Sequence, residues 1–281
     1  MAKSRRQIMF SFLLLLFFAG ITFFILTPLY AILVASFKPA KAVISSGLSY
    51  EIDFGLLTLG SYKALFLESA DRYFTWFKNS LLITVLATVV SLFFSSMVGY
   101  GLAMYQFRLK NVVFTLILLV MMVPMEIIML PLYKLMIGLK FINTFWGVIL
   151  PFAVAPLPAF FFRQYASGLP KDFMDAGRID GCTEYGMFFR IFMPLMLPAF
   201  GAMTILVALS NWNNFLWPLL VLRTEDMLTI PIGLSSLISP YGNNYELLLA
   251  GSVIAILPIL VLFVFFQRYF ISGLTVGGVK G

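Results

Sequence analysis

Six long apolar segments follow one another along the chain, with shorter polar stretches between them. They cover residues 9–34, 80–105, 112–133, 145–162, 195–222 and 247–266. A helix needs about 20 apolar residues to cross a hydrocarbon core of about 30 Å. The apolar runs are continuous and do not alternate with a period of two, so they predict helices rather than the strands of a barrel. We therefore expect an all-α, polytopic membrane protein with six transmembrane helices.

The composition agrees with this interpretation. Hydrophobic residues make up 61% of the chain and charged residues 11%, and the mean hydropathy is +0.99, far from the mixture typical of a soluble domain. Because the apolar segments recur along the whole length, we expect a single membrane domain over residues 1–281. The first segment is longer than the apolar core of a signal peptide, so we expect it to be a retained span.

The basic residues predict the orientation of the chain. If both termini lie on one side of the membrane, that side collects 11 of the 19 lysines and arginines. The excess identifies the cytoplasmic side, and it places the polar segment 169–194 there as well. Anionic lipid and this topology account for the net charge of +7, so no nucleic-acid partner is needed.

Several kinds of chemistry are excluded by the residues that are missing. The chain has no histidine and one cysteine, Cys182, so it can form neither an internal disulfide nor a metal site rich in His or Cys. The usual hydrolytic triads are excluded for the same reason. No phosphate-binding loop of the G-x-x-x-x-G-K-[ST] type occurs. We expect a chain that is not an enzyme and holds no cofactor or metal of its own.

The segment 169–194 is a charged island between two apolar runs. Helical spacing puts Phe173, Ala176, Gly177 and Asp180 on one face, where small residues beside a bulky one offer a shallow surface to a partner. Gly181 allows the chain to turn sharply afterwards. The alternative is an amphipathic helix that lies on the membrane surface. The acids of the island disfavour it, because an anionic leaflet repels them; they are Asp172, Asp175, Asp180 and Glu184.

The spacing within the island resembles a known motif. Asp175-Ala176-Gly177 is followed after three residues by Gly181 and after nine more by residues 191–194, IFMP. This resembles the EAA loop of binding-protein-dependent ABC importer permeases, with Asp175 in place of Glu, Gly177 in place of the second Ala and methionine in place of leucine near the end. Five further segments resemble the MalG-type sugar permeases, which extends the resemblance over nearly the whole chain. They are residues 28–39, 79–107, 121–135, 211–220 and 267–281.

The resemblance implies a type I ABC importer permease fold in a bacterial cytoplasmic membrane. It implies a second homologous permease, two ATPase domains that bind ATP and Mg²⁺, and an extracytoplasmic sugar-binding protein that delivers a sugar or oligosaccharide. The island helix would seat in a cleft of the ATPase, with Asp175 meeting a basic residue. The loop 223–246 would contact the binding protein; otherwise it is a solvated connector.

Two groups of polar residues are candidates for the substrate pathway. In the fifth span, Ser210, Asn213, Asn214 and Trp217 share one face of a continuous helix, and amides beside an indole suit a sugar. Hydrogen bonding between helices is the alternative. Glu126 is an acid within the third span and a candidate for gating or substrate contact, although it could instead lie at the outer interface or be protonated.

In the second span, small residues recur every three or four positions and predict close helix packing, with pathway lining as the alternative. They are Thr84, Thr88, Ser91, Ser95, Gly99 and Ala103.

Other classes of transporter fit the sequence less well. A secondary, ion-coupled transporter usually has internal repeats and acids or bases in several helices, whereas Glu126 is the clear intramembrane acid here. A permease for another small solute, such as glycerol phosphate, remains the second alternative. A dependence of transport on a separate ATPase distinguishes the importer from the ion-coupled class.

Overall fold

The computed structural model describes residues 5–47, 50–239 and 242–275. Most of them are helical, which confirms the all-α prediction. One short antiparallel pair joins β1 (Ile238–Ser239) to β2 (Gly242–Asn243). The chain forms two compact units. The first contains the chain up to Tyr73 together with Leu234–Ile256, and the second contains Phe74–Gly233 together with the residues from Leu257 on.

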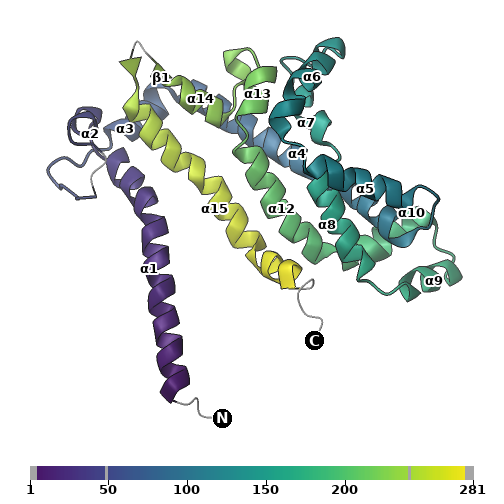
Figure 1. Cartoon of the computed structure of the whole chain (residues 1–281). Helices are drawn as coiled ribbons and strands as arrows, with labels where there is room; N and C mark the ends of the chain where they lie inside the picture. The colour runs from purple at the N-terminus through teal and green to yellow at the C-terminus, as the bar shows by residue number, and fades with distance from the viewer. Residues whose placement is uncertain (1–4, 48–49, 240–241, 276–281) are drawn as a thin grey trace. The chain divides into compact units, whose positions relative to one another are not determined.

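The first unit is built around the long N-terminal helix α1 (Arg5–Ser36), labelled in Figure 1. Its other elements are α2 (Ala40–Ser46), α3 (Gly60–Lys63), the π-helical turn η1 (Ala64–Glu68), the start of α4 (Ala70–Met104) and the first part of α15 (Tyr245–Thr275). The Tyr73 hydroxyl donates a hydrogen bond of 2.7 Å to the Gly251 carbonyl and so joins α4 to α15. Phe23 and Phe24 of α1 are 77% and 80% exposed, as expected of a helix that is apolar on every face and spans lipid.

Three described helices are long and apolar enough to cross a membrane, namely α1, α4 and α15. Three bent helix pairs satisfy the same criteria when each pair is taken as one span, which gives the six spans that the sequence predicts. Hydropathy therefore predicted the number of spans obtained in this way, but it indicated neither where they bend nor the limits of the fifth span.

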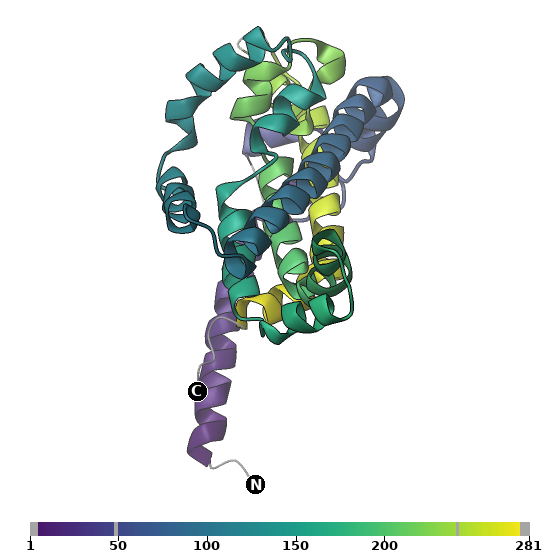
Figure 2. The same cartoon turned by 90° about the vertical axis from the view of Figure 1, so that its right-hand side faces the viewer.

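The third predicted span is divided between α5 (Lys110–Met121) and α6 (Met125–Gly138), which meet at an angle of 106° (Figure 2). Pro124 causes the break, because it lacks a backbone N–H and disfavours the helical conformation of the residue before it. The fourth span consists of α7 (Phe145–Ile149), η2 (Leu150–Phe152) and α8 (Pro156–Ser167), with a bend of 41°.

The expectation of one continuous helix over residues 195–222 is wrong. The helical path begins earlier, with α10 (Glu184–Met187), η3 (Phe188–Phe192) and α11 (Met193–Leu195), then bends by 76° into α12 (Leu197–Trp212). A separate helix, α13 (Leu216–Val221), follows. Pro218 lies in the first turn of α13, where a proline is tolerated because the backbone N–H that it lacks would have no partner within the helix.

Small residues of α4 pack closely within the second unit, as the sequence predicts. The Ala155 amide donates to the Ser95 hydroxyl at 3.0 Å, and a β-carbon at Gly99 would lie 2.6 Å from that of Phe162. The side-chain amide of Asn79, near the start of α4, donates to two carbonyls of the loop that follows α13. This loop contains η4 (Glu225–Met227) and α14 (Ile230–Ser236).

Candidate functional site

The charged island forms a short helix of the second unit, α9 (Asp172–Ile179), and one side of this helix packs against other parts of that unit. Met174 and Gly177 are buried on that side. The Tyr100 hydroxyl, near the end of α4, contacts the Met174 sulfur at 3.4 Å. A β-carbon at Gly177 would lie 2.9 Å from the Ile191 side chain, so the glycine lets α9 approach the helix formed by η3.

The opposite side of α9 is open. Phe173 is 40% exposed, and Ala176 and Asp180 are exposed as well. The sequence predicts Gly177 on the same face as these three residues, but in the structure Gly177 is buried against Met187 and Ile191. The Asp175 side chain is 72% exposed. The outer surface of α9 therefore presents acids beside an aromatic ring, which suits a partner that offers a basic group and an apolar recess.

A turn at Gly181 ends α9, as the sequence predicts. Gly181 has φ +73°, a left-handed conformation that costs other residues about 1–2 kcal/mol. Its amide donates to the Arg178 carbonyl at 3.1 Å, and the Cys182 amide donates to the Gly177 carbonyl at 2.9 Å. This pair of bonds is the Schellman motif. The Thr183 hydroxyl then accepts from the Gly186 amide at 3.1 Å and caps α10, so the direction of the chain after α9 is fixed.

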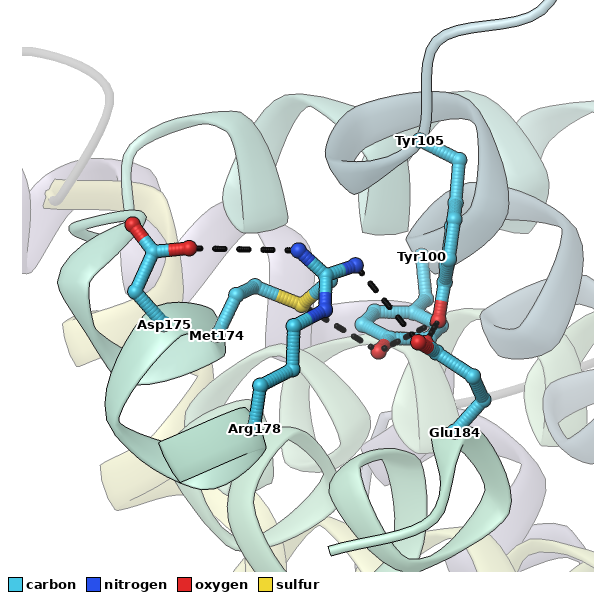
Figure 3. Close-up of polar contacts among 6 residues, drawn as sticks. All are labelled: Tyr100, Tyr105, Met174, Asp175, Arg178 and Glu184. Atoms are coloured by element: carbon cyan, nitrogen blue, oxygen red, sulfur yellow. Dashed lines mark hydrogen bonds and ion pairs between the residues drawn. The ribbon is translucent and has the colours of Figure 1, made fainter. Parts of the chain in front are cut away.

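Three side chains join α9 to the end of α4 and to α10, and we call Arg178, Glu184 and Tyr105 the clasp (Figure 3). The Arg178 guanidinium lies 3.5 Å from one carboxylate oxygen of Glu184 and 3.8 Å from Asp175. The Tyr105 hydroxyl donates to the other oxygen of Glu184. Burial and the hydrogen bond to Glu184 raise the pKa of Tyr105, so its hydroxyl keeps the proton that it donates.

Reasoning from the sequence did not find the clasp. Glu184 and Tyr105 are 79 residues apart, and no periodic pattern relates positions on different helices. The sequence does show that Arg178 follows Asp175 by three residues, a spacing at which two side chains of a helix can form an ion pair. It contains no comparable signal for Glu184 or Tyr105.

The second candidate site is a cavity of about 340 Å³ in the second unit. This volume is at the lower end of the roughly 300–1,000 Å³ of small-molecule sites. Ser210, Asn214 and Trp217, three of the predicted pathway residues, line it. Trp217 is 1% exposed, and its indole N–H donates to the Gly147 carbonyl at 3.2 Å. The indole is therefore held in place as part of the cavity wall.

The other two predicted pathway residues do not line this cavity. The Asn213 side-chain amide donates to the Leu209 carbonyl of its own helix at 3.1 Å. Asn213 is the C-cap of α12, so the helical face on which it was expected beside Trp217 does not continue. Glu126 is exposed in the first turn of α6, although its neighbour Met125 does line the cavity.

Two further polar residues line the cavity, Ser91 of α4 and Asn211 of α12. Ser91 is 3% exposed, and its hydroxyl has no hydrogen-bond partner among the described residues. A buried polar group without a partner costs about 1–3 kcal/mol, which a ligand in the cavity could offset. The sequence contains both residues, Ser91 in the stripe of small residues and Asn211 in the run NWNN, but it does not show that they meet.

The fold and these two sites define a class of protein, a polytopic membrane protein with an exposed acidic helix and a cavity among its apolar helices. Residues 91–276 match the family model described as "Binding-protein-dependent transport system inner membrane component". The chain belongs to this family of ABC importer permeases, whose members are transport components that use ATP bound by partner ATPases and substrate delivered by a binding protein.

Relatives narrow the comparison to sugar permeases. The arabinooligosaccharides transport system permease protein AraQ of Bacillus subtilis (strain 168) is 57% identical, over 95% of each chain. AraQ of Halalkalibacterium halodurans is 56% identical, over 99% of this chain and 100% of the relative. The lactose transport system permease protein LacG of Rhizobium radiobacter is 36% identical, over 82% of this chain and 83% of the relative. The predicted resemblance to MalG-type sugar permeases is confirmed.

A solved structure supports the fold. A chain of a bacterial ABC transporter involved in the import of the acidic polysaccharide alginate superimposes with a TM-score of 0.82. The match covers 96% of this chain and 99% of that chain, at 21% identity. The predicted ABC importer permease fold is therefore confirmed, and the chain is the permease subunit of a sugar ABC importer.

Proposed function

We propose that this permease moves arabino-oligosaccharides into the cytoplasm. The observation that carries the proposal is the 57% identity to a permease for arabinooligosaccharides, extending over 95% of both chains. The cavity is compatible with this substrate class, because hydroxyl and amide groups can bond to sugar hydroxyls while Trp217 and the methionines offer apolar surface to a sugar ring.

In the proposed assembly, the whole chain acts as one permease domain beside a second homologous permease. Two ATPase domains bind ATP and Mg²⁺ on the cytoplasmic side, and an extracytoplasmic sugar-binding protein delivers the substrate. The excess of basic residues supports a topology with both termini and α9 in the cytoplasm of a bacterium. The membrane lipid surrounds the apolar spans, and no nucleic acid takes part.

The outer surface of α9 is the proposed contact with the ATPase. Phe173, Asp175, Ala176 and Asp180 would enter its cleft, and the exposed Asp175 would pair with a basic residue there. Gly177 and Gly181 would shape this surface indirectly, since one allows α9 to pack closely and the other ends the helix. Closure of the ATPases on ATP would displace α9 and switch the permease between two states of access.

The proposed substrate pathway passes through the cavity lined by Ser210, Asn214 and Trp217, with Ser91 and Asn211 as further contacts. We leave Asn213 out of the pathway because its amide is engaged by its own helix. Glu126 lies beside the cavity at the start of α6, and we propose it for gating rather than for direct contact.

Reconstituted transport tests this proposal. The complete importer is placed in proteoliposomes with ATP inside and binding protein outside, and uptake of labelled arabinotriose is measured. We expect uptake that requires ATP and the ATPase and that survives ionophores. Uptake without the ATPase that ionophores abolish would identify a secondary transporter. Absence of labelled arabinotriose uptake, together with ATP-dependent uptake of labelled glycerol phosphate, would identify a permease for another solute.

A further inference from the structure

We propose that Glu184 is a positioning residue that transmits the displacement of α9 to α4. This inference rests on the proposed contact between α9 and the ATPase. It names the clasp as the connection through which that contact acts on the membrane-spanning part of the chain.

The clasp brings together segments that are distant in the sequence. Figure 3 shows Arg178 of α9, Glu184 at the start of α10 and Tyr105 after the end of α4 meeting at one carboxylate. Arg178 approaches one oxygen of Glu184, and the Tyr105 hydroxyl donates to the other. The Tyr105 hydroxyl also lies 3.2 Å from that of Tyr100. Glu184 is thus a charged group that contacts both α9 and the residue after the end of α4.

The clasp is better suited to transmission than to stability. Arg178 and Glu184 are about half exposed, at 49% and 54%, and exposed ion pairs contribute little to stability. Met174, which is 4% exposed, and the buried Gly177 already hold α9 in place. The clasp adds polar contacts, through Glu184, between Arg178 of α9 and Tyr105 after the end of α4.

The connection leads to the proposed substrate pathway. The Lys110 ammonium donates to the carbonyls of Ala103 and Tyr105, at 3.3 and 3.0 Å, and so holds the end of α4 together. The helix α4 is continuous from Met104 back to Ser91 in the cavity wall, a length of roughly 20 Å at 1.5 Å per residue. A rigid helix of this kind can carry a displacement between two sites.

The arrangement also connects the clasp to the docking surface. Arg178 lies between Glu184 and Asp175, and Asp175 is the residue proposed to meet a basic group of the ATPase. When that group occupies Asp175, Arg178 is left with Glu184 as its partner. Docking of the ATPase would then tighten the clasp.

The test measures how much sugar is taken up per ATP hydrolysed by the complete importer in proteoliposomes. The variants are Tyr105→Phe, Glu184→Gln and the two combined. The control is Tyr185→Phe, which removes a hydroxyl from a residue that is adjacent in sequence, is 74% exposed and has no part in the clasp. We expect each single variant to lower the ratio at least about fivefold, the lower end of typical coupling between sites, and the combined variant to lower it no further.

An unchanged ratio in both single variants, or independent effects that multiply in the combined variant, would overturn the proposal. If a single variant assembles poorly, exchanging the two charges of the ion pair provides a second test. Arg178→Glu and Glu184→Arg should each lower the ratio, and their combination should recover part of it; a combination as poor as the worse single variant would also overturn the proposal. Failure of the proposed function looks different, because the wild-type importer itself would then show no ATP-dependent uptake.

Discussion

Asp175 and Gly177 lie two residues apart on α9 and face in opposite directions. Asp175 is exposed, whereas Gly177 is buried against Met187 and Ile191. The sequence predicted the importance of both positions but placed Gly177 on the same outward face as Phe173. Helical spacing shows which residues lie near one another on a helix, but it does not show where the boundary between the buried and exposed faces falls.

The exposure of Asp175 leads to the first prediction. Asp175→Lys should abolish sugar uptake without loss of membrane insertion, because like charges at a docking contact cost several kcal/mol. Uptake is compared with that of Asp172→Lys, the same change of charge one turn earlier on α9, which should have a smaller effect. Normal uptake by Asp175→Lys at normal expression would remove Asp175 from the ATPase contact.

Neighbouring asparagines provide the second prediction. Asn214 lines the cavity, while the Asn213 amide bonds to its own helix. Asn214→Leu should lower uptake or alter sugar preference, because it replaces a polar wall with a bulky apolar one. Asn213→Leu is the matched control and should assemble and transport normally. If both variants transport normally, or if Asn214→Leu fails only because the complex falls apart, Asn214 serves packing rather than transport.

The unpaired hydroxyl of Ser91 provides the third prediction. Ser91→Ala should raise the KM for sugar uptake about fivefold, which corresponds to one hydrogen bond of about 1 kcal/mol. Ser96→Ala is the control on the same helix, because Ser96 is fully buried but already bonded to the Phe93 carbonyl at 2.8 Å. Equal KM values for Ser91→Ala and the wild-type protein would show that no sugar group reaches Ser91.

At the scale of elements, hydropathy predicted the spans better than it predicted their shape. The long helices α1, α4 and α15 follow directly from apolar runs. The break at Pro124 was missed because the residues on both sides of it are apolar. The break between α12 and α13 was missed because the polar residues there were assigned to one face of a helix. Pro131, by contrast, lies within a continuous α6. A proline in an apolar run therefore indicates a bend only where the neighbouring backbone can start a new helix.

The turn that ends α9 gives the fourth prediction. Gly181→Val should weaken ATPase-driven uptake, since a branched residue at φ +73° is strained by at least about 1–2 kcal/mol. Gly181→Asn should be tolerated better, because asparagine also occurs at this position of helix ends. Sugar uptake by the two variants is compared. Equal uptake would show that transport does not depend on the left-handed conformation at residue 181.

At the scale of the whole molecule, the resemblance to a known family predicted the function, whereas hydropathy predicted only the class of fold. Hydropathy predicted an all-α membrane protein, and the spacing around Asp175 and Gly181 pointed to the permease family. The orientation that the charges indicate stays a prediction. The clasp and the cavity could not be predicted, because each joins residues from helices that are far apart in the sequence, such as Tyr105 with Glu184 or Ser91 with Asn214.

Cross-linking to the ATPase tests the central claim, that α9 is the element through which the ATPase acts on this permease. Cys182 is the one native cysteine, so Cys182→Ser provides a background without cysteine in this chain, to which Ala176→Cys on α9 or Glu225→Cys on η4 is added. In the assembled importer, we predict that a short thiol cross-linker joins residue 176 to the ATPase, that the yield changes when ATP binds, and that residue 225 gives no such product. Absence of the product from residue 176 in an importer that still transports sugar, or its formation from residue 225, would contradict the account.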